Sequence, residues 1–260
     1  MIVRALSGFL LAALIALVAR RTRSLSPSGA IAATIVGTLA VAAGWSWGVL
    51  LIVYFAASSL LSHVGRSAKE RRTASVVAKA GPRDAAQVLA NGATFAAAAL
   101  FVLLKPDVRW IALGAGSLAA SSADTWATEI GTLFGGNPRS ILTWRTIPVG
   151  TSGGVSLIGS LAAVGGAIFV ALVAASLGWT WIVCRNVMIG GIAGAFVDSL
   201  LGATLQSRRW CDACSRGTER LIHDCGAHTR PHGGFFWMDN DLVNFLSSAA
   251  GGLLAMMLWR

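Results

Sequence analysis

Residues 110–131, WIALGAGSLAASSADTWATEIG, form an apolar run that ends in two acidic side chains, Asp124 and Glu129. The run approaches the roughly 20 residues that an α-helix needs to cross a bilayer. A carboxylate within a membrane span is costly unless it is paired, hydrated or bound to a metal, so it indicates a functional site. On an ideal helix this spacing puts the two side chains about 140° apart, so we do not expect them to bind one ion together.

The rest of the chain has the composition of a membrane protein. Of its 260 residues, 55% are hydrophobic and 12% are charged, about half the charged fraction of a soluble domain. The apolar stretches predict an all-α, polytopic bundle of about eight transmembrane helices, one domain over residues 1–260 with no separate soluble domain. The first span is expected to be retained, because its basic cluster follows the apolar run. The expected spans are 3–19, 28–44, 46–62, 85–104, 110–130, 153–177, 180–205 and 241–259.

Basic residues are distributed unevenly over the connections between these spans. One side of the membrane receives 16 of the 21 lysines and arginines, and the other side receives five. The positive-inside rule therefore places the first side in the cytoplasm and both termini outside. The same rule accounts for the net charge of +10 without nucleic acid as a partner. We expect function at the long cytoplasmic connections, about 63–84, 131–152 and 206–240.

Three spans carry an aspartate at the expected cytoplasmic end, namely Asp124, Asp198 and Asp241. Asp198 shares one helix face with Gly191 and Gly202, whose small size allows close approach of another helix. An aspartate on that face needs a partner, either a divalent cation or a nearby arginine. The alternative for all three residues is a set of separate helix ends whose carboxylates reach water.

The segment MDNDLVNFL, residues 238–246, opens the last span with a group of oxygen-bearing side chains. Asn240, Asp241 and Asn244 can project to one side of the first turns. Ligands of this kind suit Mg²⁺, which prefers one or two carboxylates together with phosphate oxygens and water. Asp239 or Asp241 can alternatively cap the start of the helix.

A glycine-rich turn, GTSGGVS at residues 150–156, precedes the sixth span. Backbone N–H groups at a helix N-terminus make a suitable place for phosphate, and arginines can clamp its oxygens in bidentate fashion. The alternative is a tight loop that allows close helix packing. The candidate phosphate-binding residues are Thr151, Ser152, Gly153 and Gly154, the preceding arginines Arg139 and Arg145, and Lys79 in the loop 63–84.

A separate Cys/His group occupies residues 211–228 of the last long connection. Its spacing is typical of a small zinc turn, and thiols on the cytoplasmic side favour metal over disulfide. Unligated loop cysteines are the alternative. The candidate zinc ligands are Cys211, Cys214, Cys225, His223 and His228.

Four sequence blocks together resemble one known family. SADTWATEIG (122–131), GTSGGVS (150–156), GAFVDSLLGATLQ (194–206) and DNDLVNFLSS (239–248) are similar, in this order, to the phytyl-phosphate kinase / transmembrane-protein-19 family of integral membrane proteins. The resemblance covers nearly the whole chain. It implies a Mg²⁺-dependent kinase that transfers the terminal phosphate of a nucleoside triphosphate, CTP or ATP, to phytyl or another prenyl phosphate at the cytoplasmic face.

The resemblance also implies roles for individual residues. Asp124, Asp198 and Asp241 are the expected catalytic metal ligands, and Glu129 is either a ligand or an orienting group. The expected nucleotide- and phosphate-binding residues are Arg139, Arg145, Thr151, Ser152, Gly153, Gly154, Lys79, Asn240, Asn244, Glu129 and Ser199. The Cys/His group is similar to a feature of only some family members, which argues against a catalytic role for it.

Two other functions use the same types of residue. An ion or lipid-phosphate transporter also carries intramembrane carboxylates, but the outer halves of these spans are nearly free of charge. A lipid transferase that cleaves a nucleotide-activated precursor at a similar metal site is the third candidate.

Overall fold

The computed structural model describes residues 2–79 and 81–259, and over these residues all eight expected spans are helices. Five of them have the length and hydropathy of membrane spans by themselves, and a sixth is shorter and apolar. The fold class, a polytopic helical bundle, is therefore confirmed. The eight helices are α1 (Ile2–Arg21), α2 (Pro27–Ala43), α3 (Trp45–His63), α5 (Ala85–Leu104), α6 (Val108–Phe134), α7 (Leu157–Ser176), α8 (Trp181–Thr204) and α9 (Asn240–Met257).

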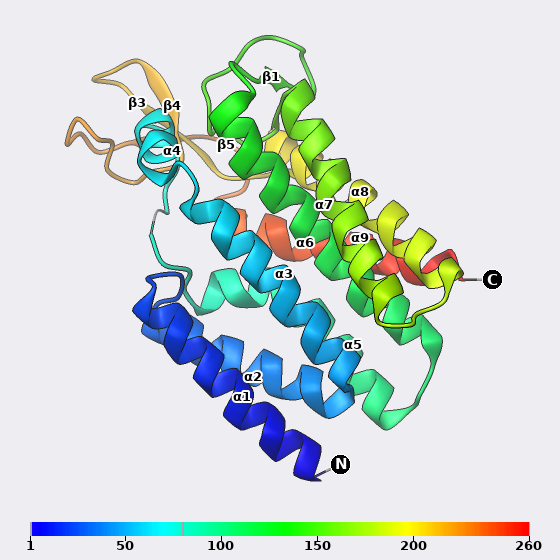
Figure 1. Ribbon diagram of the computed structural model, residues 1–260. Helices are drawn as coiled ribbons and strands as arrows, with labels where there is room; N and C mark the ends of the chain where they lie inside the picture. The colour runs from blue at the N-terminus through cyan, green and yellow to red at the C-terminus, as the bar shows by residue number, and fades with distance from the viewer. Residues whose placement is uncertain (1, 80, 260) are drawn as a thin grey trace.

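The connections sort into the two ends of this bundle, as Figure 1 shows. The turns α2–α3, α5–α6 and α7–α8 lie at the end that also holds the N and C termini. The opposite end, which we call the loop end, holds the α1–α2 turn and the three long connections. This alternation is the one that the hydropathy pattern predicts.

Helix starts are fixed by side-chain caps that satisfy backbone N–H groups left free in the first turn. At the start of α2, Ser26 Oγ accepts from Gly29 N at 3.1 Å. At the start of α9 the cap is Asp239, which accepts from Leu242 N at 2.9 Å. Asp241 is therefore free for another role.

Helix α6 lies at the centre of the bundle and contains residues 110–131, the apolar run with Asp124 and Glu129. Every residue from Ala112 to Ala123 is buried, because α6 packs against α5, α7, α8 and α9. Small residues allow this close packing: a Cβ at Gly194 of α8 would lie 2.4 Å from the Ala120 Cβ of α6. The glycine face predicted on α8 is therefore a packing face, and it brings Asp198 toward α6.

The loop end contains short elements that the sequence did not indicate. Helix α4 (Arg66–Thr73) lies within the connection expected to be a loop. Strands β1 (Arg139–Ser140) and β2 (Gly154–Val155) pair antiparallel. Strands β3 (Arg208–Cys211), β4 (Arg216–Thr218) and β5 (Arg230–Gly233) form a three-stranded sheet in the order β4-β3-β5.

Candidate functional site

The side chains of Asp124 on α6 and Asp198 on α8 are close neighbours. Two carboxyl groups at this range require a proton or a cation between them, because like charges repel strongly where little water is present. Ser247 Oγ on α9 donates to Asp198 Oδ2 at 2.9 Å. Three helices thus meet at this aspartate pair, and Asp124 and Asp198 are brought together as an acidic centre.

Asp241 has a different environment from the aspartate pair. It is 8% exposed and forms an ion pair with Lys79, which also reaches Asp84 at 3.3 Å. The hydrogen bond that Lys79 donates to Asp241 is the largest cause that raises the pKa of Lys79. Asp241 Oδ1 is buried and has no hydrogen-bond partner within residues 2–79 and 81–259. Asp241 precedes Ser247 by six residues, about 9 Å along the helix, so it lies nearer the loop end than the pair does.

Glu129 is held by a lysine that the sequence reasoning did not single out. Lys69 on α4 forms an ion pair with Glu129, and Ser62 Oγ donates to the same carboxylate at 2.6 Å. Lys69 Nζ also donates to the carbonyl oxygens of Leu61 and Ser62 at 2.8 and 3.0 Å. Glu129 therefore fixes α4 against the ends of α3 and α6, whereas Asp124 partners Asp198.

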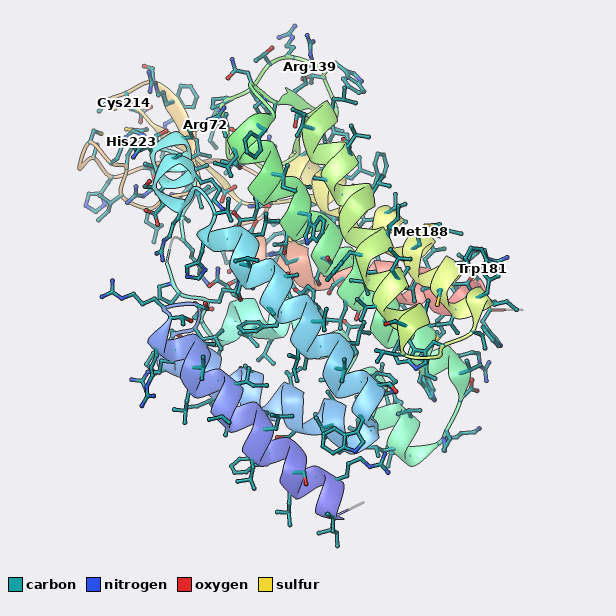
Figure 2. All side chains as sticks on the ribbon, viewed as in Figure 1. Arg72, Arg139, Trp181, Met188, Cys214 and His223 are labelled. Atoms are coloured by element: carbon teal, nitrogen blue, oxygen red, sulfur yellow. The ribbon has the colours of Figure 1, made fainter. Side chains whose placement is uncertain are left out.

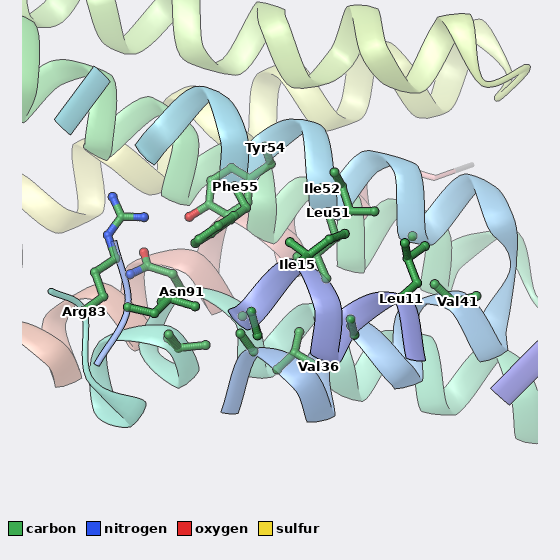
Figure 3. A pocket seen from close by; sticks show the side chains of 18 of the residues that line it. Leu11, Ile15, Val36, Val41, Leu51, Ile52, Tyr54, Phe55, Arg83 and Asn91 are labelled. Carbon is green, nitrogen blue, oxygen red and sulfur yellow. The ribbon is translucent and has the colours of Figure 1, made fainter. Parts of the chain in front are cut away.

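An apolar pocket lies between α1, α2, α3 and α5 and has a polar end (Figure 3). Leu11 and Val41 lie at one end, and Arg83, Asn91 and the Tyr54 hydroxyl lie at the other. The guanidinium of Arg83 donates to Ser62 Oγ at 3.2 Å. Along α2 the lining runs from residue 33 to residue 41, about 12 Å of helix. The pocket can hold an extended apolar chain with an anionic group beside Arg83.

The polar end of this pocket adjoins the aspartate pair. The Tyr54 hydroxyl lies near the side chains of Ser121 and Ser58 and near the charges of both Arg83 and Asp124. Ser121 lies one helical turn before Asp124 on α6. Arg83 and Asp124 are therefore both near Tyr54.

The glycine-rich turn is not a helix N-terminus, so the prediction is wrong on this point. Gly154 and Val155 pair with β1, and α7 begins only at Leu157 with Ser156 as its cap. Gly153 has a φ of +77°, and a Cβ there would lie 2.4 Å from the Ala203 Cβ. These observations indicate a tight turn that packs on α8.

The other residues expected to contact nucleotide lie around this turn and at the start of α9. Ser152 Oγ donates to Glu219, and Thr151 N donates to Pro148 O at 3.2 Å. Arg139 and Arg145 are exposed on the β1 side of the loop end, where Figure 2 places Arg139 away from Cys214 and His223. On α9 and α8, Asn240 is exposed, and Asn244 and Ser199 are partly buried.

The Cys/His group gathers four of its five expected ligands. Donor atoms of Cys211, Cys214, His223 and Cys225 all lie within 4.8 Å of one another, whereas His228 is outside this cluster. The backbone N–H of Ala227, followed by His223, lowers the pKa of Cys225 to about 6. The cluster lies in the β-sheet region at the loop end (Figure 2).

With this geometry in view, comparison with known proteins identifies the family. The family model described as "Integral membrane protein DUF92" matches residues 10–252. The chain belongs to this family. Together with the apolar helices, the match shows a multi-pass integral membrane protein and confirms the resemblance drawn from the four sequence blocks.

Relatives of this DUF92 protein occur in plants and in an archaeon. Protein PGR of Arabidopsis thaliana is 30% identical over 94% of this chain and 92% of its own length. An uncharacterized membrane protein of Methanocaldococcus jannaschii is 27% identical, with 99% of this chain and 95% of the relative covered. Protein VTE6, chloroplastic, of Arabidopsis thaliana is 28% identical over 90% of this chain and 65% of its own length. No solved structure matches the chain.

Sequence reasoning missed several residues of the site in this DUF92 protein. Tyr54 is the sole tyrosine of the chain and lies in the middle of an apolar span. This position could have indicated a candidate site residue from the sequence. Arg83 and Lys69 stand among many basic residues of one loop, so neither is distinctive in sequence. Ser247 is one of several small residues on α9, and only its position opposite Asp198 marks it.

Proposed function

We propose that this protein is a membrane-embedded kinase for an isoprenoid monophosphate. It would transfer the terminal phosphate of a nucleoside triphosphate, CTP or ATP, to phytyl phosphate or another prenyl phosphate and release the diphosphate. The observation that carries the proposal is the position of one apolar pocket whose cationic end adjoins an aspartate pair. Membership of the family adds support, because the resemblance implies the same reaction.

The acceptor fits the pocket by its chemistry. An isoprenoid chain needs an apolar lining, which α1, α2, α3 and α5 supply. Its phosphate needs a cation, and Arg83 lies at the polar end with its guanidinium hydrogen-bonded only to Ser62 Oγ among the described contacts. Arginine binds phosphate through parallel N–H donors. Arg83 would therefore hold the acceptor phosphate at the polar end of the pocket while the isoprenoid chain lies along the apolar lining.

The acidic centre would serve the nucleotide. Asp124 and Asp198 supply carboxylate oxygens at the acidic centre, and Asp241, nearer the loop end, adds a buried Oδ1 that has no partner within the described part of the chain. This donor set fits Mg²⁺, which when bound neutralises charge on the transferring phosphate. Lys79, at Asp241, is a cation for the donor phosphates.

The phosphoryl transfer requires no covalent intermediate with the protein. An oxygen of the prenyl phosphate forms a bond to the terminal phosphorus, and the bond from that phosphorus to the nucleoside diphosphate oxygen breaks. The acceptor oxygen is already anionic, so no general base is required. Positioning and charge stabilisation are the protein's contribution.

The loop end would face the cytoplasm, where the nucleotide is available. Sixteen of the 21 basic residues belong to connections at this end, and the positive-inside rule assigns such connections to the cytoplasm. Both termini would then be outside. Cysteine accessibility to an impermeant maleimide, with single cysteines at Ser75 and Ser176 in a variant lacking the four native cysteines, tests this orientation.

The test of the function is an assay of purified protein in lipid nanodiscs. We expect conversion of phytyl or geranylgeranyl phosphate to the diphosphate with Mg²⁺ and CTP or ATP. Asp124→Asn and Asp198→Asn should each lower turnover at least about a hundredfold, the scale of lost transition-state charge stabilisation. Asp107→Asn is the matched control, because asparagine caps a helix as well as aspartate does and Asp107 lies at the other end of the bundle.

Unchanged turnover in Asp198→Asn would exclude this site as the catalytic centre. Mass spectrometry of the nucleotide product separates the alternatives: a nucleoside diphosphate supports the kinase, whereas a monophosphate indicates a lipid transferase. Phosphate or ion flux in proteoliposomes without nucleotide would instead indicate a transporter.

A further inference from the structure

A tetrahedral metal site can be assembled from four side chains of the β-sheet region. Cys211 Sγ and Cys225 Sγ lie 3.7 Å apart, and His223 Nδ1 lies 3.2 Å from Cys225 Sγ. Zinc bonded to sulfur at about 2.3 Å in a tetrahedron separates two sulfurs by about 3.8 Å. The observed spacing is thus that of ligands around one ion, with Cys214 as the fourth member.

The number of these ligands suits a structural site rather than a catalytic one, because four protein ligands leave no open coordination position. Cys211 is fully buried and His223 is 4% exposed, whereas Cys214 is half-buried and Cys225 is exposed. His223 Nδ1 also contacts the carboxylate of Asp224 at 2.7 Å. That carboxylate is half-exposed and can turn to water when Nδ1 binds a metal.

We propose that Cys211, Cys214, His223 and Cys225 bind one Zn²⁺, and that this zinc braces the loop carrying Lys79 and Arg83. The proposal goes beyond the kinase function and does not depend on it. Zinc is favoured over a disulfide because sulfur and imidazole ligands select it and because cytoplasmic thiols stay reduced.

The connection runs through the end of strand β4, which follows Cys214 in the chain and is hydrogen-bonded to the segment after α4. Glu219 N donates to Val76 O at 2.9 Å, and Thr218 Oγ1 reaches the same oxygen at 3.3 Å. Arg220 Nη1 donates to Ala74 O at 2.7 Å. Residues 218–220, located between two of the zinc ligands in the chain, therefore hold residues 74–76.

The held segment leads directly to the candidate site. Val76 is three residues before Lys79, the partner of Asp241, and seven before Arg83 at the pocket. Glu219 also accepts from Gln206 Nε2 at 2.9 Å, which ties β4 to the end of α8. Loss of the metal would make residues 211–225 more mobile. The hydrogen bonds from residues 218–220 to residues 74–76 would then weaken, and the segment that leads to Lys79 and Arg83 would be less well ordered.

The experiment measures zinc content and hydrogen exchange on the whole protein in detergent. Mass spectrometry for metals should find about one zinc per chain, which falls at least fivefold in Cys214→Ser and in Cys211→Ser. Cys184→Ser, at a thiol within α8, and His228→Ala, at the histidine outside the cluster, are the controls and should keep the metal. Chelation should raise hydrogen exchange of residues 74–83 and leave α7 unchanged.

Each other result overturns a defined part of the proposal. Zinc-free protein that is well folded, or an intact disulfide under reducing purification, would remove the metal site. Bound zinc whose removal leaves the exchange of residues 74–83 unchanged would remove the brace. None of these readouts depends on catalysis, so they can be repeated in Asp198→Asn.

Discussion

Lys69 and Glu129 form an ion pair across α4 and α6, with side chains only 9% and 19% exposed. Lys69 also donates to two carbonyl oxygens at the end of α3, Leu61 O and Ser62 O. One ammonium group therefore joins three helices at the loop end. This contact fixes the position of α4, which directly precedes the loop that carries Lys79 and Arg83.

Removal of Lys69 should destabilise the protein more than removal of both partners. Lys69→Met leaves Glu129 with a buried charge and should cost about 3 kcal/mol, whereas Lys69→Met with Glu129→Leu should cost much less. Thermal unfolding in detergent measures both. Equal losses in the single and double variants would show that the pair contributes no coupling.

Arg83 should govern binding of the lipid phosphate rather than turnover. Arg83→Gln keeps the backbone bonds of this residue to Ser24 and Ser26 but removes the charge at the pocket. We expect KM for the prenyl phosphate to rise about tenfold, equal to about 1.4 kcal/mol, with kcat nearly unchanged. Arg71→Gln, at an exposed arginine of α4, is the control and should leave KM unchanged.

Two adjacent serines of α9 offer a matched comparison. Ser247 donates to Asp198 at 2.9 Å, whereas Ser248 donates to Ala90 O at 3.2 Å. Each alanine variant loses one buried hydroxyl and about 1 kcal/mol of stability. Only Ser247→Ala should lower kcat, by about tenfold, because only Ser247 orients a carboxylate of the acidic centre. Steady-state kinetics of both variants decide this, and equal kcat values would contradict it.

Glu219 should make the loop end less stable as the pH rises. Burial raises its pKa above the ordinary value of 4.5, and the hydrogen bond from Ser152 offsets only part of this. A folded-state pKa above the unfolded one means that the folded protein binds the extra proton. The stabilisation is therefore full below pH 4.5 and is lost as the pH rises through the raised pKa.

The Glu219→Gln variant isolates this titration. Its melting temperature should fall less between pH 5 and pH 8 than that of the unaltered protein, because glutamine stays neutral. Parallel melting curves of the two proteins over this range would contradict the assignment.

Hydropathy in the sequence predicted all eight long helices, because each must bury its backbone polar groups within itself in a membrane. Helix ends were predicted less well where a tertiary contact competes with helix propagation. Pairing of β2 with β1 moved the start of α7 from residue 153 to residue 157. The three-stranded sheet has strands of at most four residues, too short for a periodic pattern to be visible.

The sequence by itself determined that this protein is a membrane bundle whose carboxylates gather at one end, since apolar length and charge bias are local properties of the chain. Only the tertiary structure decided which side chains meet. Asp124 faces Asp198 because small residues let α6 and α8 approach closely, while Glu129 and Asp241 each have a lysine partner. Such pairings depend on the packing distance and rotation of whole helices, and no local spacing in the sequence specifies either.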